Sequence, residues 1–170
     1  MKKNKNIILI GFMGVGKGTT ARALVSASDM YAIDTDDLIE SLENTKIKNI
    51  FEENGEQYFR NLESKTAKWL ENSVTNSIIS TGGGFYKVEN LKEIGTVIYL
   101  KSSFDAIFDK ILASPNAKKK IKKRPLLKDK KKAKELFDLR TKEYKMVANI
   151  TVDIENKTTE EVVEYILNNN

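Results

Sequence analysis

The stretch from residue 7 to residue 20 constrains the fold more than any other part of this sequence. It reads IILIGFMGVGKGTT, an apolar run that leads into a glycine-rich turn and then into a helix start. The apolar run predicts a buried strand, Gly11, Gly14 and Gly16 allow backbone N–H groups to converge on an anion, and Lys17 adds a positive charge. This order is typical of a phosphate-binding loop, although a glycine-rich strand-to-helix turn can also be purely structural.

One position of this loop departs from the common pattern GxxxxGK[ST]. The residue after Lys17 is Gly18, and the hydroxyl residues Thr19 and Thr20 come only afterwards. The hydroxyl expected after the lysine is the usual direct ligand of Mg²⁺ beside a bound nucleotide. The sequence therefore predicts a nucleoside triphosphate site that lacks this ligand.

Composition limits the classes of protein to which the chain can belong. With 170 residues and 40% apolar content, it predicts one domain with a sizeable core. It lacks an apolar stretch near the ~20 residues of a membrane span, and its basic start leads straight into the first predicted strand, so we expect a cytoplasmic enzyme without membrane contact. The absence of cysteine excludes disulfides, and the absence of histidine leaves proton transfer to carboxylates, lysines or water.

The net charge of +5 is concentrated in one basic segment. Residues 114–134 contain eleven Lys or Arg and one Asp, a net charge of +10, so the rest of the chain carries −5. A local run of positive charge fits a mobile lid that closes over polyphosphate better than it fits a surface that binds nucleic acid. The other alternative is a charge run that is merely solvated. Because like charges repel, we expect little of this segment to pack and the segment to be open or mobile without an anion.

Apolar runs and helical patterns alternate along the chain. This alternation predicts an α/β three-layer sandwich, with a mostly parallel sheet of about five strands, helices on both faces and ligands at the carboxyl ends of the strands. Strands are predicted at 7–10, 31–33, 78–79, 97–100 and 150–152. Helices are predicted at 17–25, 37–42, 56–70, 104–112, 133–145 and 159–167.

Two carboxylates follow the second predicted strand. Asp34 and Asp36 come directly after it, and the alternation of side chains along a strand predicts that both point to the same side of the ligand-binding edge. One could hold Mg²⁺ through water while the other accepts a proton from an attacking hydroxyl, as phosphoryl transfer requires. The alternative is that Asp36 only caps the next helix.

Arg60 and Glu63 lie one turn apart on a predicted helix. They could form an ordinary ion pair. Alternatively, Arg60 binds a substrate anion while Glu63 fixes its guanidinium. The spacing alone does not separate the two interpretations.

Three consecutive glycines, residues 82–84, follow the third predicted strand and permit close backbone approach to a ligand. Arg124 in the basic segment and Arg140 on the next helix are candidates for contacts with phosphate and with a second substrate anion.

Together these motifs resemble those of the shikimate kinases, P-loop kinases of small molecules with the nucleoside monophosphate kinase fold. The resemblance covers nearly the whole chain and follows the order of the family's motifs. They are GFMGVGK at 11–17, DTD at 34–36, IFEENGEQYFRNLE at 50–63, TGGG at 81–84, RPLL at 124–127 and RTKEY at 140–144.

The resemblance implies transfer of the γ-phosphoryl group of ATP to the 3-hydroxyl of shikimate, in aromatic amino acid biosynthesis, by a monomer that does not bind nucleic acid. It implies a substrate-binding helical segment at about 35–63 and a basic lid at about 114–132. As catalytic residues, Asp36 would act as the base, Lys17 would neutralise the transferring phosphoryl group, and Arg124 would close from the lid onto the phosphates.

The resemblance also implies the binding residues. Shikimate would be bound by Asp36, Arg60, Gly83 and Arg140, with the two arginines on its carboxylate. The nucleotide would be cradled by Gly14, Val15, Gly16, Lys17, Gly18 and Thr19. The cofactor Mg²⁺ would be held by Asp34 through water, with Thr19 as a second candidate ligand, and Lys110 is expected where the family often has an arginine near adenine.

Other nucleotide-binding proteins share part of this pattern. Gly18 resembles the GKGT of adenylate kinases, and gluconate kinases share the loop and the fold, but the DTD and FRNLE motifs argue against both. A non-enzymatic GTP switch would show an NKxD motif after a late strand. The nearest string, NKTT at 156–159, lacks the final Asp that pairs with guanine.

Overall fold

The computed structural model describes residues 6–122 and 125–170, whose strands form one sheet. The sheet has five strands in the order β2-β3-β1-β4-β5, all paired in parallel, with β1 at its centre. Every residue of β1 is buried, as expected for an apolar strand between two helical layers. The strands are β1 (Ile7–Ile10), β2 (Tyr31–Asp34), β3 (Ser77–Ser80), β4 (Thr96–Lys101) and β5 (Ile150–Asp153).

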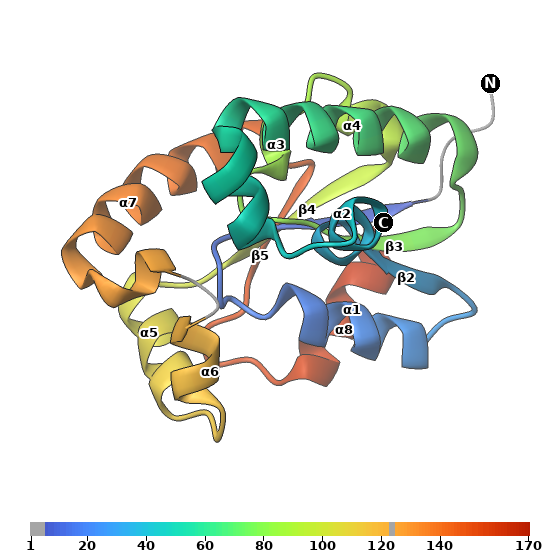
Figure 1. Cartoon of the computed structure of the whole chain (residues 1–170). Coiled ribbons are helices and arrows are strands. Elements are labelled where there is room, and N and C mark those ends of the chain that lie inside the picture. Colours follow the sequence, from blue (N-terminus) through green and yellow to red (C-terminus); the bar gives the residue numbers. More distant parts are fainter. Residues whose placement is uncertain (1–5, 123–124) are drawn as a thin grey trace.

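Helices cover both faces of this sheet (Figure 1). α1 and α8 lie on one face, and α3, α4 and α7 lie on the other. Within the described ranges, each helix is too short or too polar to span a membrane. The helices are α1 (Lys17–Ser26), α2 (Thr35–Glu43), α3 (Ile47–Ser73), α4 (Leu91–Ile94), α5 (Phe104–Leu112), α6 (Ala117–Lys122), α7 (Lys130–Val147) and α8 (Thr159–Asn169), with short 3₁₀ helices η1 (Phe85–Lys87) and η2 (Pro125–Lys128).

The α/β class and the parallel sheet predicted from the sequence are confirmed, with all five strands in the expected places. α3 extends further toward the N-terminus than predicted, because the helix continues across a kink at Gly55, where φ is 82°. A glycine at that position interrupts the helical pattern, so the first part of the helix was missed. α4, α6 and the 3₁₀ helices were also missed, since periodicity is not readable over so few residues.

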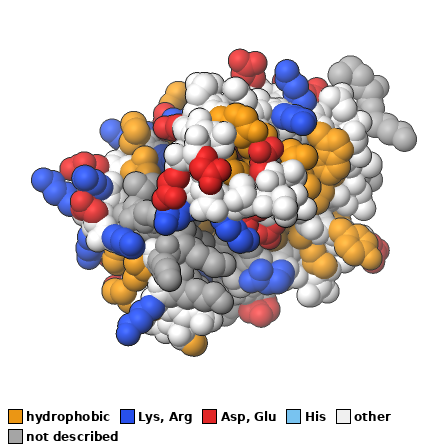
Figure 2. Space-filling model, in the orientation of Figure 1, with side chains coloured by type: hydrophobic (Ala, Val, Ile, Leu, Met, Phe, Trp, Pro, Cys, Tyr) orange, Lys and Arg blue, Asp and Glu red, His pale blue; other side chains and the backbone are white. Residues whose placement is uncertain are grey.

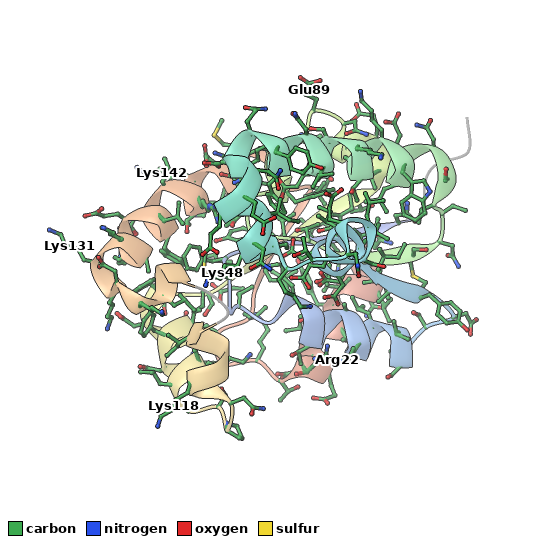
Figure 3. The ribbon with its side chains drawn as sticks, viewed as in Figure 1. Arg22, Lys48, Glu89, Lys118, Lys131 and Lys142 are labelled. Carbon is green, nitrogen blue, oxygen red and sulfur yellow. The ribbon has the colours of Figure 1, made fainter. Side chains whose placement is uncertain are left out.

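The basic segment packs more than its charge suggests. The side chain of Ile121 packs against the main core, and Leu127 is buried within it. Most of the other described side chains of the segment are exposed or only partly buried, as expected from its charge, and these two apolar residues anchor it. The lysines of this segment whose side chains are described are exposed: Lys118 and Lys131 point away from the molecule (Figure 3), and Lys and Arg side chains gather over this end of the molecule (Figure 2).

Candidate active site

The loop between β1 and α1 has the geometry of a phosphate-binding loop. Its turn into α1 is made at Gly16, whose φ of 114° strongly favours glycine. The side chain of Lys17 folds back over the loop, and its Nζ donates to the carbonyl oxygens of Gly11 at 2.7 Å and Phe12 at 3.2 Å. The side chain of Val15 is buried beneath the loop, so any contact that Val15 makes with a ligand is restricted to its backbone.

A cavity of about 390 Å³ lies beside this loop, where β1, β2 and β3 end. It brings together residues that are far apart in the sequence, as expected at the carboxyl ends of parallel strands. The predicted site residues that line it are Gly14, Gly16, Lys17, Gly18, Thr19, Asp34, Asp36, Gly83 and Lys110. A larger and more open hollow of about 680 Å³ lies between α1 and α8, and none of the motif residues that the structure describes lines it.

The two carboxylates of the DTD motif have different roles in the structure. Asp34 caps α2: its Oδ1 accepts from the backbone N–H of Asp36 at 3.0 Å and of Asp37 at 3.3 Å. Its Oδ2 accepts from the hydroxyl of Ser80 at 2.9 Å. The helix cap is thus Asp34, and the interpretation of Asp36 as the cap is wrong. The strand alternation invoked for this pair does not apply either, because α2 begins at Thr35.

Asp36 is left available to the cavity by this arrangement. Burial raises its pKa to about 7, with a further upward contribution from Asp34 and an opposing one from Lys17. A carboxylate with a pKa near neutrality can exchange a proton at physiological pH. The geometry therefore permits Asp36 to act as a general base.

The three consecutive glycines, residues 82–84, form what we call the glycine segment. A Cβ atom at Gly82 would collide with the carboxylate of Asp36, and one at Gly84 would collide with the guanidinium of Arg60. A Cβ atom at Gly83 would lie 2.9 Å from Nη1 of Arg140. Each glycine thus leaves room for one charged side chain, which explains why three glycines occur in succession.

Arg60 is embedded in a carboxylate network. Its Nη1 donates to Oε2 of Glu63 at 2.7 Å, and its Nε and Nη2 donate to Oε1 of Glu56 at 3.2 and 2.9 Å. The ion pair predicted from the spacing is present, which leaves the functional interpretation of Arg60 open. Burial raises the pKa of Glu63 although Arg60 opposes the shift, and Oε1 of Glu63 is buried without a hydrogen-bond partner among the described residues.

Two side chains that hydrogen-bond to the glycine segment are not apparent from the sequence. The hydroxyl of Thr35 accepts from the backbone N–H of Gly82 at 3.1 Å, and the hydroxyl of Tyr144 donates to the carbonyl oxygen of Gly83 at 2.7 Å. Both residues lie inside motifs named above, DTD and RTKEY. Their position in these motifs is the sequence signal that could have identified them. Arg124, predicted to contact phosphate, lies outside the described residues.

A parallel α/β sheet with this loop and this cavity defines a P-loop nucleotide-binding protein. Residues 13–169 match the family model described as shikimate kinase. The chain is 40% identical over 168 residues to the shikimate kinase of Sulfurihydrogenibium sp., with 96% of each chain covered. It is 38% identical over 141 residues to that of Helicobacter hepaticus, covering 83% of this chain and 81% of the other.

Solved structures agree with these relatives. The shikimate kinase from Acinetobacter baumannii in complex with shikimate matches with a TM-score of 0.84 and 29% identity, over 98% of this chain and 92% of the other. The shikimate kinase from Aquifex aeolicus matches with a TM-score of 0.77 and 36% identity, over 95% and 94%. The chain belongs to the shikimate kinase family, and it is therefore a phosphotransferase rather than a nucleotide switch.

Proposed function

We propose that the cavity between the phosphate-binding loop and the glycine segment is where this chain transfers the γ-phosphoryl group of ATP to the 3-hydroxyl of shikimate. The products are ADP and shikimate 3-phosphate, an intermediate of aromatic amino acid biosynthesis. The observation that carries the proposal is the glycine segment itself, where Asp36, Arg140 and Arg60 each approach one glycine. One carboxylate and two guanidinium groups suit an acceptor that has hydroxyls and a carboxylate.

Asp36 and Lys17 carry the chemistry in this proposal. Asp36 accepts the proton of the 3-hydroxyl as its oxygen attacks, because a base with a pKa near 7 is matched to neutral pH. Lys17 lies at the base of the loop and moves its ammonium from the loop carbonyls to the transferring phosphoryl group, whose negative charge it neutralises. Arg124 would add a second positive charge from the basic segment, a role that stays a prediction from the sequence.

Shikimate binding rests on the arginines and on the glycine backbone. Arg60 and Arg140 bind the carboxylate, since guanidinium groups make planar two-point contacts with carboxylates. Gly83 contributes its backbone, which no side chain of its own covers. Glu63 fits this assignment through Arg60, because its Oε2 accepts from Nη1 of Arg60 at 2.7 Å and so fixes the guanidinium beside Gly84.

Mg²⁺ is the cofactor included in the proposal. Both oxygens of Asp34 already accept hydrogen bonds, so this carboxylate suits an ion that it reaches through water. The described residues form no cluster of three or more His, Cys, Asp or Glu side chains that could hold a metal. This donor set fits Mg²⁺, which keeps several waters and takes its other ligands from substrate phosphates. When bound, the ion supplies positive charge to the triphosphate.

Substrate choice tests the proposed function directly. We expect ADP release to saturate with shikimate, and to stay at the background rate with AMP or gluconate as acceptor. A phosphoryl acceptor other than shikimate that gives the higher kcat/KM would contradict the proposal. The proposal also includes a monomeric state and a cytoplasmic location. Native mass spectrometry tests the first, and cell fractionation tests the second.

Gly18→Ser is expected to lower the free Mg²⁺ needed for half-maximal activity by about threefold, which corresponds to under ~1 kcal/mol. The position is open: within the described ranges, a Cβ atom at Gly18 would meet Nη1 of Arg22 at 3.5 Å and nothing closer. Serine therefore fits, and its hydroxyl can become a direct ligand. Shikimate KM should change little.

The matched control for this prediction is Gly18→Ala, which adds the same Cβ without the hydroxyl. It should leave the free Mg²⁺ needed for half-maximal activity unchanged. Calorimetric titration with MgADP should likewise show tighter binding by the serine variant than by the alanine variant. A serine variant with equal or higher magnesium demand would mean that Gly18 serves close backbone approach to phosphate instead.

A further inference from the structure

Two buried hydroxyls tie the glycine segment to the helices on either side of it. Thr35, the first residue of α2, accepts from the backbone N–H of Gly82 at 3.1 Å. Tyr144, near the end of α7, donates to the carbonyl oxygen of Gly83 at 2.7 Å. Adjacent glycines are therefore joined to two different helices, over sequence separations of 47 and 61 residues.

Each tie lies next to a residue of the proposed site. Thr35 immediately precedes Asp36 on α2. Arg140 precedes Tyr144 by four residues, so the two side chains share one face of α7. A Cβ at Gly83 would have Nη1 of Arg140 at 2.9 Å and the Tyr144 hydroxyl at 3.8 Å, which places both groups against the same glycine.

Burial keeps both hydroxyls in place. Thr35 is 0% exposed and Tyr144 is 1% exposed. The ring of Tyr144 packs with its centroid 4.8 Å from that of Tyr86 and 5.3 Å from that of Tyr99. A hydrogen bond held by such packing fixes the relative position of the two elements that it joins.

We infer that Thr35 and Tyr144 are positioning residues: the first holds Asp36, and the second holds Arg140, at fixed distances from the glycine segment. The inference rests on the proposed function, since it takes Asp36 as the group that acts on the acceptor hydroxyl and Arg140 as a group that binds the carboxylate. Loss of either hydroxyl should therefore affect a different step. The Thr35 tie serves the chemical step, and the Tyr144 tie serves shikimate binding.

Tyr144→Phe removes one hydroxyl and keeps the ring. We expect the Kd of shikimate, measured by calorimetry, to rise about threefold to tenfold, the range for loss of one hydrogen bond, while the Kd of ADP stays unchanged. Tyr99→Phe is the matched control, because it also removes a buried tyrosine hydroxyl from the same aromatic cluster, but one that interacts with Thr141 instead of the carbonyl oxygen of Gly83. It should leave the Kd of shikimate within about twofold of wild type.

Thr35→Val keeps the shape of the side chain and removes the acceptor. We expect kcat to fall about tenfold with a smaller change in shikimate KM, because displacement of a catalytic group by a fraction of an ångström slows the chemical step. Thr35→Ser retains the hydroxyl and should recover most of kcat. A merely structural role for Thr35 would lower thermal stability without this recovery pattern in kcat.

Several results would overturn the inference. For Tyr144→Phe, these are unchanged shikimate binding, or equal weakening of shikimate and ADP binding. For Tyr99→Phe, it is a rise in the Kd of shikimate as large as that of Tyr144→Phe. For Thr35→Val, it is an unchanged kcat. Failure of the proposed function is distinguishable, because Arg140→Lys would then leave shikimate binding unchanged as well.

Two further variants test the inference if Tyr144→Phe or Thr35→Val does not fold. Gly83→Ala tests the position of Arg140 from the side of the glycine, since its Cβ would press on Nη1 of Arg140 and leave the Tyr144 hydroxyl at ordinary van der Waals distance. It should weaken shikimate binding and spare ADP binding, and wild-type shikimate affinity in this variant would contradict the inference. Thr35→Ala replaces Thr35→Val in the same assay with the same expected loss of kcat, and wild-type kcat would contradict the inference.

Discussion

Asp36→Asn should lower kcat by about 10²- to 10⁴-fold, the usual cost of losing a general base. The amide keeps the shape of the carboxylate but cannot accept the proton of the attacking hydroxyl. Initial rates of ADP release at saturating ATP and shikimate measure this loss. Asp37→Asn is the matched control, since Asp37 is the next residue on α2 and is exposed, and it should retain wild-type turnover.

The pKa of Asp36 gives this prediction a dependence on pH. Wild-type kcat/KM for shikimate should fall as pH decreases below about 7, because the base becomes protonated. A folded pKa raised from 3.8 to about 7 also means that the native state binds more protons than the unfolded state between these values. The free energy of unfolding contributed by this group therefore decreases as pH rises through that window.

Asp36→Asn should remove this penalty and stabilise the folded protein at pH 8 by about 2–4 kcal/mol, with the difference shrinking toward pH 4. Denaturant melts at both pH values measure it. An Asp36→Asn protein that keeps more than half of wild-type turnover would refute the catalytic assignment. A variant less stable than wild type at pH 8 would contradict the raised pKa of Asp36.

Arg60→Lys and Arg140→Lys should each raise the KM for shikimate by roughly 10- to 150-fold, equivalent to about 1.5–3 kcal/mol for hydrogen bonds between charged groups. Lysine keeps the charge but cannot form a planar two-point contact with a carboxylate. At position 60 it would also have to hold Glu63, which Arg60 holds with one end of its guanidinium. The KM for ATP should stay within about threefold of wild type.

A reciprocal substitution controls for the arginine-to-lysine change. Lys142 is exposed on the same helix as Arg140 and points away from the molecule (Figure 3), so Lys142→Arg should change neither constant. Parallel increases in the KM values of both substrates would identify Arg60 and Arg140 as structural residues.

The sequence predicted those parts of the molecule that depend on local patterns. The buried strand and the glycine-rich loop at residues 7–20 are contiguous, so their geometry follows from neighbouring residues. The meeting of the glycine segment with Arg60 and Arg140 was not derivable from spacing, because the partners come from different helices. The resemblance to a known family placed them in one site, and the structure supplied the contacts.

The errors have physical reasons of the same kind. The hydroxyls of Thr35 and Tyr144 bond to glycines far away in the sequence, so no local pattern identifies them. From the sequence, Asp34 is predicted only to hold magnesium through water, although an aspartate before a helix is also a natural cap. Leu127 lies in a lysine-rich segment whose charge predicts exposure, so its burial in the core does not follow from the sequence.

The proposed acceptor site exists only when distant parts of the chain have come together. Asp36, Arg60, the glycine segment and Arg140 belong to four separate elements, and a partly unfolded chain in which any one of them detaches loses the site. Shikimate should consequently bind the native state and not the unfolded ensemble. By mass action, a bound acceptor then favours folding of the entire protein, by about 2.7 kcal/mol at a concentration ~100 times its Kd. In a cell, the supply of its own substrate would thus govern how long this enzyme resists unfolding and proteolysis.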